Sequence, residues 1–133
     1  MEVNNCALRL KELYFEKIEF TRKGSKNKNE PSFGFRIQIA KSKENMNKVT
    51  VELTIDKKQE YEVTICLSGI FKVCLDESMT SQDAEQLINK NAVAILMPYI
   101  RSQVSLITAQ PGIDCIVFPP LNINQLLDDS EPN

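Results

Sequence analysis

The sequence predicts an α+β fold in which a four-stranded antiparallel sheet is packed by one long kinked helix and a short C-terminal helix. Two observations support this class. The first half of the chain alternates apolar and polar residues in four stretches, and a helical pattern follows from about residue 81 to residue 109. The 133 residues are enough to bury one core without staples. We therefore expect a single domain over residues 1–127 and a polar C-terminal tail over residues 128–133.

Four predicted strands account for the N-terminal half. The first covers residues 7–20, and its apolar residues change phase twice, which indicates bulges within a long strand. The next three strands are centred on residues 35–39, 49–55 and 61–67, and each has one apolar face. The fourth strand is expected to bend at Gly69 and then to continue.

The long helix has recognisable ends and one interior proline. It begins near Thr80 or Ser81, either of which can accept a hydrogen bond from a first-turn N–H, and it ends at residues 110–112. Pro98 has no N–H to donate to the preceding turn. We therefore predict either a kink at Pro98 or two abutting helices that meet near residues 89–91.

The predicted helix carries two apolar stripes. At about 100° per residue, the first stripe consists of Val93, Met97, Ile100, Val104 and Ile107. The second stripe, about 140° away, consists of Ile88, Ile95, Tyr99 and Leu106. A helix that is apolar on two sides is buried between two layers, and in so small a chain the second layer is expected to be another subunit. The expected oligomer interface consists of Ile88, Ile95, Met97 and Tyr99.

Composition argues against nucleic-acid and membrane partners. The formal net charge of -2 and the pI near 5.2 provide no broad basic field, and the lysine-rich stretch over residues 22–28 is expected to be a solvated loop. The longest apolar run, residues 92–97, is far shorter than the roughly 20 residues that span a bilayer. We expect no membrane insertion and a cytoplasmic location.

Nothing in the sequence indicates catalysis or a cofactor. Histidine is absent, which removes the commonest general base and the usual partner of a nucleophile. The remaining carboxylates are expected to be solvated in turns or on polar helix faces, as for Asp56, Glu60, Asp76 and Glu85. No glycine-rich phosphate loop is present among the four glycines. We expect that the protein is not an enzyme.

The cysteines do not form a metal-binding motif. They are Cys6, Cys66, Cys74 and Cys115, which lie at wide spacings in apolar surroundings, without a C-x-x-C pair. A zinc site would need all four to converge from distant segments. We expect buried, reduced thiols and no metal.

One helix leaves part of the predicted sheet uncovered. Four strands make a sheet about 19 Å wide, whereas a helix covers only about 10–12 Å. The apolar segment over residues 113–127, a partner subunit or a ligand would have to close the remaining face.

Three sequence blocks resemble the SecB family of protein-export chaperones. They are Ser68-Gly69-Ile70-Phe71 at the end of a strand, residues 91–101 in the long helix, and Pro119-Pro120-Leu121-Asn122-Ile123 after it. The order and spacing of the blocks match the family, and the plan of four strands and a long helix agrees over most of the chain. The resemblance implies a SecB-like subunit that assembles into a homotetramer, a dimer of dimers, with long helices sandwiched between sheets.

The resemblance also implies a function and a site. SecB-type chaperones are holdases without a nucleotide cycle, and they bind unfolded precursor polypeptides in long apolar grooves. Carried across by position, the client-binding groove consists of Phe35, Ile37, Ile39, Ile113, Ile116, Phe118, Leu121, Leu126 and Leu127. Taken singly, each of these residues is more often part of a plain core or of an oligomer interface than of a binding groove.

The sequence departs from the family at the surface that members present to the SecA translocation ATPase. Those members carry acidic residues there, whereas the corresponding places hold Lys17, Thr21, Glu62 and Thr64. We therefore expect at most weak SecA binding. Three roles stay open: an export chaperone, a SecB-like chaperone dedicated to an antitoxin of a toxin–antitoxin system, and a single-partner scaffold without chaperone activity. A small thioesterase-like enzyme is disfavoured by the missing histidine.

Overall fold

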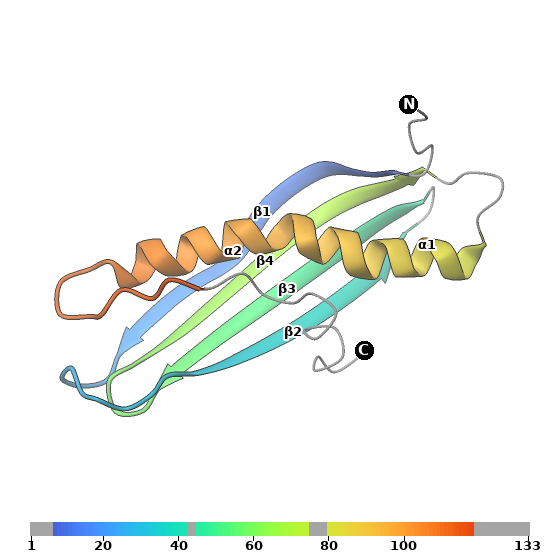
Figure 1. Ribbon diagram of the computed structural model, residues 1–133. Coiled ribbons are helices and arrows are strands. Elements are labelled where there is room, and N and C mark those ends of the chain that lie inside the picture. The colour runs from blue at the N-terminus through green and yellow to red at the C-terminus, as the bar shows by residue number, and fades with distance from the viewer. Residues whose placement is uncertain (1–6, 43–44, 75–79, 119–133) are drawn as a thin grey trace.

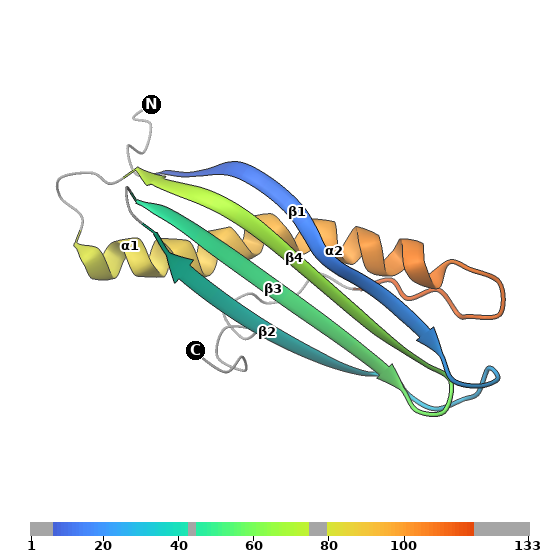
Figure 2. The same ribbon diagram turned by 180° about the vertical axis from the view of Figure 1, so that it is seen from behind.

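The computed structural model describes residues 7–42, 45–74 and 80–118 (Figure 1). The elements are strands β1 (Ala7–Arg22), β2 (Ser32–Lys41), β3 (Met46–Lys57) and β4 (Tyr61–Cys74), then helix α1 (Ser81–Leu87), π-helix η1 (Ile88–Ala92) and helix α2 (Val93–Thr108). The strands form one antiparallel sheet in the order β1-β4-β3-β2. The helical segments lie end to end along one face of the sheet, and Figure 2 shows the opposite face, which none of the described helices covers.

This arrangement confirms the predicted α+β class, the four antiparallel strands and the long helical run. The predicted short C-terminal helix lies outside the described residues. Strand β1 also has the predicted bulges, because its register against β4 shifts between Leu10 and Glu12 and again between Phe15 and Lys17. Each shift returns the next apolar residue of β1 to the face under the helices.

The core lies between the helices and the alternating residues of β3 and β4. A Cβ atom added to Gly69 would lie 2.8 Å from Cε1 of Phe71 and 3.0 Å from Cδ2 of Leu96. Gly69 therefore permits the close approach of α2 to the sheet. The strand residues that are almost fully buried are Val49, Val51, Leu53, Ile55, Tyr61, Val63, Ile65, Leu67 and Phe71.

The break in the helical run coincides with η1, which contains residues 89–91, where the sequence predicted two abutting helices. A π-helical turn holds more residues than an α-helical turn, so the residues that precede η1 are rotated relative to α2. Ile88 is consequently 3% exposed and packs in the core, away from the second stripe to which a regular helix would assign it. Pro98 lies inside α2 and is exposed.

The first apolar stripe of α2 faces the sheet, and the second faces away from it. The buried members of the first stripe are Val93, Met97, Ile100 and Val104. Leu96, which fell on neither stripe, is also fully buried. On the other side Tyr99 is 45% exposed and Leu106 is 69% exposed, whereas Ile95 is half-buried and also packs against the core. Of the expected interface residues, Ile88 and Met97 therefore pack within the chain, while Ile95 and Tyr99 have open surface.

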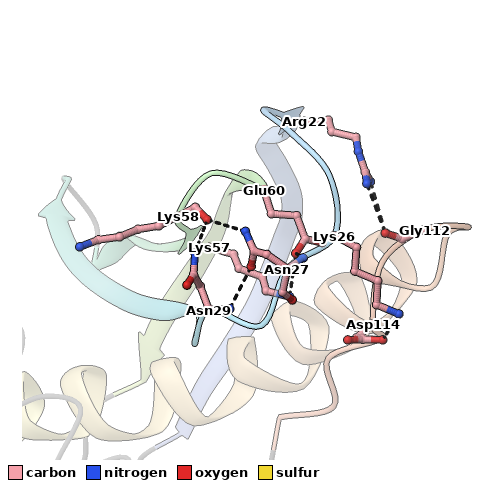
Figure 3. A network of polar contacts seen from close by, with 9 residues as sticks. All are labelled: Arg22, Lys26, Asn27, Asn29, Lys57, Lys58, Glu60, Gly112 and Asp114. Atoms are coloured by element: carbon pink, nitrogen blue, oxygen red, sulfur yellow. Dashed lines mark hydrogen bonds and ion pairs between the residues drawn. The ribbon is translucent and has the colours of Figure 1, made fainter.

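A buried ion pair ties the β3–β4 hairpin to the loop between β1 and β2 (Figure 3). Lys57 Nζ lies 2.8 Å from Glu60 Oε1, and the two side chains are 8% and 0% exposed. The Asn27 N–H donates to the same carboxylate oxygen at 2.9 Å, and Lys57 donates to the Asn27 carbonyl at 3.1 Å. The side-chain amides of Asn27 and Asn29 donate to the Lys58 carbonyl. The expectation that Glu60 is solvated is therefore wrong, because the fold brings a cation and a backbone donor to it.

Candidate functional site

The segment after α2, residues 109–118, returns along α2 on the same side of the sheet (Figure 1). We call this segment the crossover. The chain turns back at Gly112, whose φ of 83° lies in the left-handed region that glycine adopts without strain. Helix α2 packs mainly over β4 and β3. The crossover therefore covers part of the apolar face toward β2 that the helices leave open.

Hydrogen bonds fasten the crossover to the last turns of α2. The Ile116 N–H donates to Thr108 Oγ1 at 2.9 Å, and Ser105 Oγ donates to the Ile116 carbonyl at 3.1 Å. The Thr108 hydroxyl itself donates to the Val104 carbonyl at 2.7 Å. Polar side chains at the end of α2 thus hold an extended segment at a fixed distance from the helix.

The last residue of β1 and the loop that follows it fasten the other end of the crossover (Figure 3). Both terminal nitrogens of Arg22 lie 3.4 Å from the Gly112 carbonyl, and Lys26 Nζ lies 2.8 Å from Asp114 Oδ1. The hydrogen bond and the charge of Lys26 lower the pKa of the Asp114 carboxyl. Residues 22–28 were expected to form a plain solvated loop. They also anchor the crossover, an outcome that depends on contacts between residues some 90 positions apart in the sequence.

An aromatic cluster forms where the crossover meets β2. The Phe118 ring centroid lies 4.9 Å from that of Phe33 and 6.4 Å from that of Phe35, and the ring pairs are tilted by 59° and 45°. We call Phe33, Phe35 and Phe118 the aromatic patch. Phe33 is 43% exposed, and Val117 of the crossover is 77% exposed beside the patch. Large apolar side chains therefore reach the surface at one edge of the sheet.

The predicted groove residues divide into three groups. Ile37 and Ile113 are 8% and 9% exposed and belong to the core. The half-buried residues that pack against the core are Phe35, Ile39, Ile116 and Phe118. The last group, Leu121, Leu126 and Leu127, lies outside the described residues.

Sequence reasoning missed Phe33 and Val117, although they have the most open apolar surface at this edge. Phe33 had a detectable signal, because it lies two residues before Phe35 and continues the same alternation on β2. Val117 had none, since the surface that an irregular segment presents depends on its tertiary contacts.

A shallow groove runs between α2 and the crossover. We call it the helix groove; its volume is about 470 Å³, and its lining residues are Pro98, Arg101, Ser102, Ser105, Val117 and Phe118. Phe118 belongs to both the helix groove and the aromatic patch, so the two surfaces are continuous. Together they present aliphatic, aromatic and hydroxyl groups with one cation, Arg101.

Three glutamates on the outer face of the sheet, opposite the helices, are paired with lysines. Glu62 lies 2.7 Å from Lys23, and Glu19 lies 3.7 Å from Lys17. On the same face Glu16 lies 3.0 Å from Lys48 and accepts a hydrogen bond from Ser68. The Ser68 hydroxyl, and then Lys48, lower the pKa of the Glu16 carboxyl. Glu52 lies on the same face without an ion pair among the described residues, so the lysines reduce the negative charge of this face but do not cancel it.

Three of the four cysteines are described and differ in exposure, whereas Cys6 lies outside the described residues. Cys66 and Cys74 are half-buried, and burial raises the pKa of the Cys66 thiol. Cys115 is exposed, so the expectation of buried thiols is wrong there, because the crossover lies on the surface of the helix layer. Within the described ranges, no group of three or more histidine, cysteine, aspartate or glutamate residues is placed to hold a metal ion. The described helices include none that is long and apolar enough to cross a membrane.

Comparison with protein families finds a match to the model described as preprotein translocase subunit SecB, over residues 2–132. An uncharacterized protein of Methanocaldococcus jannaschii is 26% identical, and the match covers 95% of this chain and 86% of that protein. The protein-export protein SecB of Methylococcus capsulatus is 30% identical over 59% of this chain, but only 48% of that relative is covered.

Comparison with solved structures supports the same fold. A SecB-like chaperone of Mycobacterium tuberculosis, solved in complex with a peptide from the HigA1 antitoxin, superposes with a TM-score of 0.71. The similarity covers 86% of this chain and 88% of that one, at 12% sequence identity.

Proposed function

Because the chain belongs to the SecB family, we propose that it is an ATP-independent chaperone that holds unfolded polypeptides against the aromatic patch and the helix groove. Family membership and the SecB-like fold support a chaperone role. The observation that carries the proposal is the continuous apolar surface around Phe118, where Phe33 and Val117 are 43% and 77% exposed. An apolar surface with open aromatic groups binds apolar side chains of a polypeptide whose own core has not formed.

The test is suppression of aggregation of a chemically denatured protein that is diluted into buffer without nucleotide. We expect the full chain to suppress aggregation at a stoichiometric ratio, and added ATP to leave the suppression unchanged. A folded client should not be bound. Binding of one folded protein together with failure to hold several unrelated unfolded ones would instead support a single-partner scaffold.

The paired charges of the outer face favour a second candidate within the same family, a chaperone dedicated to an antitoxin. Lys23 and Lys17 pair with Glu62 and Glu19, which reduces the negative charge that this face offers to a basic docking surface. The SecB-like chaperone of M. tuberculosis, which was solved with a peptide from an antitoxin, is an example of a similar fold that binds this class of client.

We expect SecA from the same organism to bind only weakly, with a dissociation constant above the micromolar range, because electrostatic complementarity is small. Titration calorimetry at low and moderate salt measures this affinity. Tight binding that weakens with salt would contradict the expectation and would favour the export role. Replacing Lys17 and Lys23 by glutamate should strengthen the interaction if charge is the missing component.

We also propose that the chain assembles into a homotetramer through the outward side of α2. Ile95, Tyr99 and Leu106 supply an apolar stripe on that side, and Leu106 is 69% exposed. Light scattering is expected to return about four times the chain mass of 15.1 kDa. The variant Leu106→Glu should lower that mass without lowering the melting temperature of the subunit, whereas Ala94→Glu, a charge at another exposed position of α2, should not. A 15.1 kDa particle from the unmodified chain at micromolar concentration would refute the assembly.

A further inference from the structure

Arg101 is the one charged residue in the sixteen-residue sequence of α2. It is half-buried, and its Nε is shielded from solvent without a hydrogen-bond partner among the residues that the structure describes. Among the described residues, no carboxylate forms an ion pair with it. By contrast, both terminal nitrogens of Arg22 donate hydrogen bonds to the Gly112 carbonyl.

The surroundings of Arg101 make its cation available to a ligand. It lines the helix groove with Pro98, Val117 and Phe118, whose side chains cannot accept a hydrogen bond, and with the hydroxyls of Ser102 and Ser105, which are neutral. Neither hydroxyl accepts a hydrogen bond from the Arg101 Nε, so its charge stays uncompensated among the described residues. Asp114, the charged residue of the crossover, lies 2.8 Å from Lys26 and is thereby already paired. A partly desolvated guanidinium without a counter-ion is costly, and an incoming anion removes that cost.

We propose that Arg101 determines client specificity by binding a carboxylate within an otherwise apolar segment of the polypeptide. This inference rests on the proposed chaperone function and names the chemical class of segment that the helix groove accepts. An aspartate or glutamate side chain places its two oxygens against the planar guanidinium, while its apolar neighbours contact Val117 and Phe118. The helix groove therefore binds segments with one negative charge flanked by apolar residues more tightly than uniformly apolar or basic segments.

The experiment compares three synthetic peptides of equal length and identical apolar flanks, with glutamate, glutamine or lysine at the centre. Their affinity for the full chain is measured by fluorescence anisotropy. We expect the glutamate peptide to bind about tenfold more tightly than the glutamine peptide, because the extra interaction is a charge-assisted hydrogen bond in a partly apolar site. The lysine peptide should bind most weakly. These comparisons use the unmodified protein, so they do not depend on the folding of any variant.

Two variants and one control attribute the preference to Arg101. Arg101→Met keeps the apolar length of the side chain and should bind the glutamate and glutamine peptides equally. Arg101→Lys keeps the charge but lacks the planar pair of N–H donors that can bond both carboxylate oxygens, so it should retain only part of the preference for the glutamate peptide. Lys90→Met, which removes an exposed cation from η1, should leave the preference unchanged.

The outcomes separate this inference from the function on which it rests. Equal affinity of the unmodified chain for the glutamate and glutamine peptides would overturn the role of Arg101 and leave the chaperone function standing. A glutamate preference that persists in Arg101→Met would do the same, since another cation would then be responsible. Failure of the unmodified chain to bind any of the peptides would contradict the proposed function and this inference together.

Discussion

Replacing Phe33 by aspartate is expected to weaken the holding of an unfolded polypeptide about tenfold or more, while the subunit stays folded. A buried phenylalanine side chain contributes about 1.5–3 kcal/mol, and each 1.4 kcal/mol is a factor of about ten in affinity. Phe33 is 43% exposed at the sheet edge, so a charge there remains hydrated in the free protein. In the complex the same charge would have to be desolvated against an apolar client, which opposes binding.

The matched control is Gln38→Asp, which places the same charge on the same strand but on the outer face. It should hold clients like the unmodified protein. Val117→Asp, on the crossover, should weaken holding as Phe33→Asp does. Each variant is compared by suppression of aggregation and by thermal melting. Variants at Phe33 and Val117 that melt normally and hold clients at full strength would show that the apolar surface around Phe118 is not the binding site.

A charge at Ile37 tests the boundary between the groove and the core. Ile37 is one of the residues that the family resemblance assigns to the groove, yet it is only 8% exposed. An unpaired charge in a core costs several kcal/mol, so Ile37→Asp is expected to unfold the subunit rather than only to weaken client binding.

Replacing Lys57 by methionine is expected to cause the largest loss of stability among conservative changes to the polar residues of the described fold. The side chain of Glu60 is 0% exposed, and Lys57 is the cation that compensates it at 2.8 Å. Removing one partner of a buried ion pair leaves an uncompensated buried charge, which is far costlier than exchanging both partners for neutral groups. The double variant Lys57→Met with Glu60→Gln should therefore recover much of the lost free energy of unfolding.

The contribution of the Lys57–Glu60 ion pair to the free energy of unfolding is expected to depend on pH. The hydrogen bond from Lys57, and then the Asn27 N–H, lower the pKa of Glu60 below its ordinary value of 4.5. A lowered carboxyl pKa in the folded state means that the contribution to stability is present above about pH 4.5 and is lost as the pH falls through the folded-state value.

Urea unfolding at pH 7 and at pH 4 or below, on the unmodified chain and on Lys57→Met, measures both effects. The difference in the free energy of unfolding between the two proteins should narrow as the pH falls, because protonation removes the charge that the variant leaves unpaired. A difference that is small at pH 7, or that widens in acid, would show that the ion pair does not stabilise the loop between β1 and β2.

Much of the candidate site was accessible from the sequence because it follows periodicity. The alternation of Phe35, Ile37 and Ile39 places one side of β2 on the apolar face, and the same alternation extends to Phe33. Periodicity reports which face a residue occupies but not how much of that face is covered. Whether Ile37 is core or surface depends on how far the crossover reaches over β2.

Periodicity also failed to predict the burial of one residue of the helical run. A regular spacing of 3.6 residues per turn aligns Ile88 with Tyr99, but η1 changes the phase and turns Ile88 into the core. No local signal for the π-helical turn was evident in the sequence, and in the structure η1 contacts β1 and β4.

The α+β class, the four strands, the bulges of β1 and the apolar stripe of α2 that faces the sheet were all predictable from the amino-acid sequence. These follow from local alternation and from the burial of one face, which are properties of neighbouring residues. Three features became visible only in the folded chain: Glu60 is buried with Lys57, Phe33 and Val117 remain exposed, and Arg101 lines a groove without a carboxylate among the described residues. The reason is physical: burial, pairing and exposure are set by segments far apart in the chain, and residues 22–29 and 109–118 acquire their partners only when the sheet and the helix have brought them together.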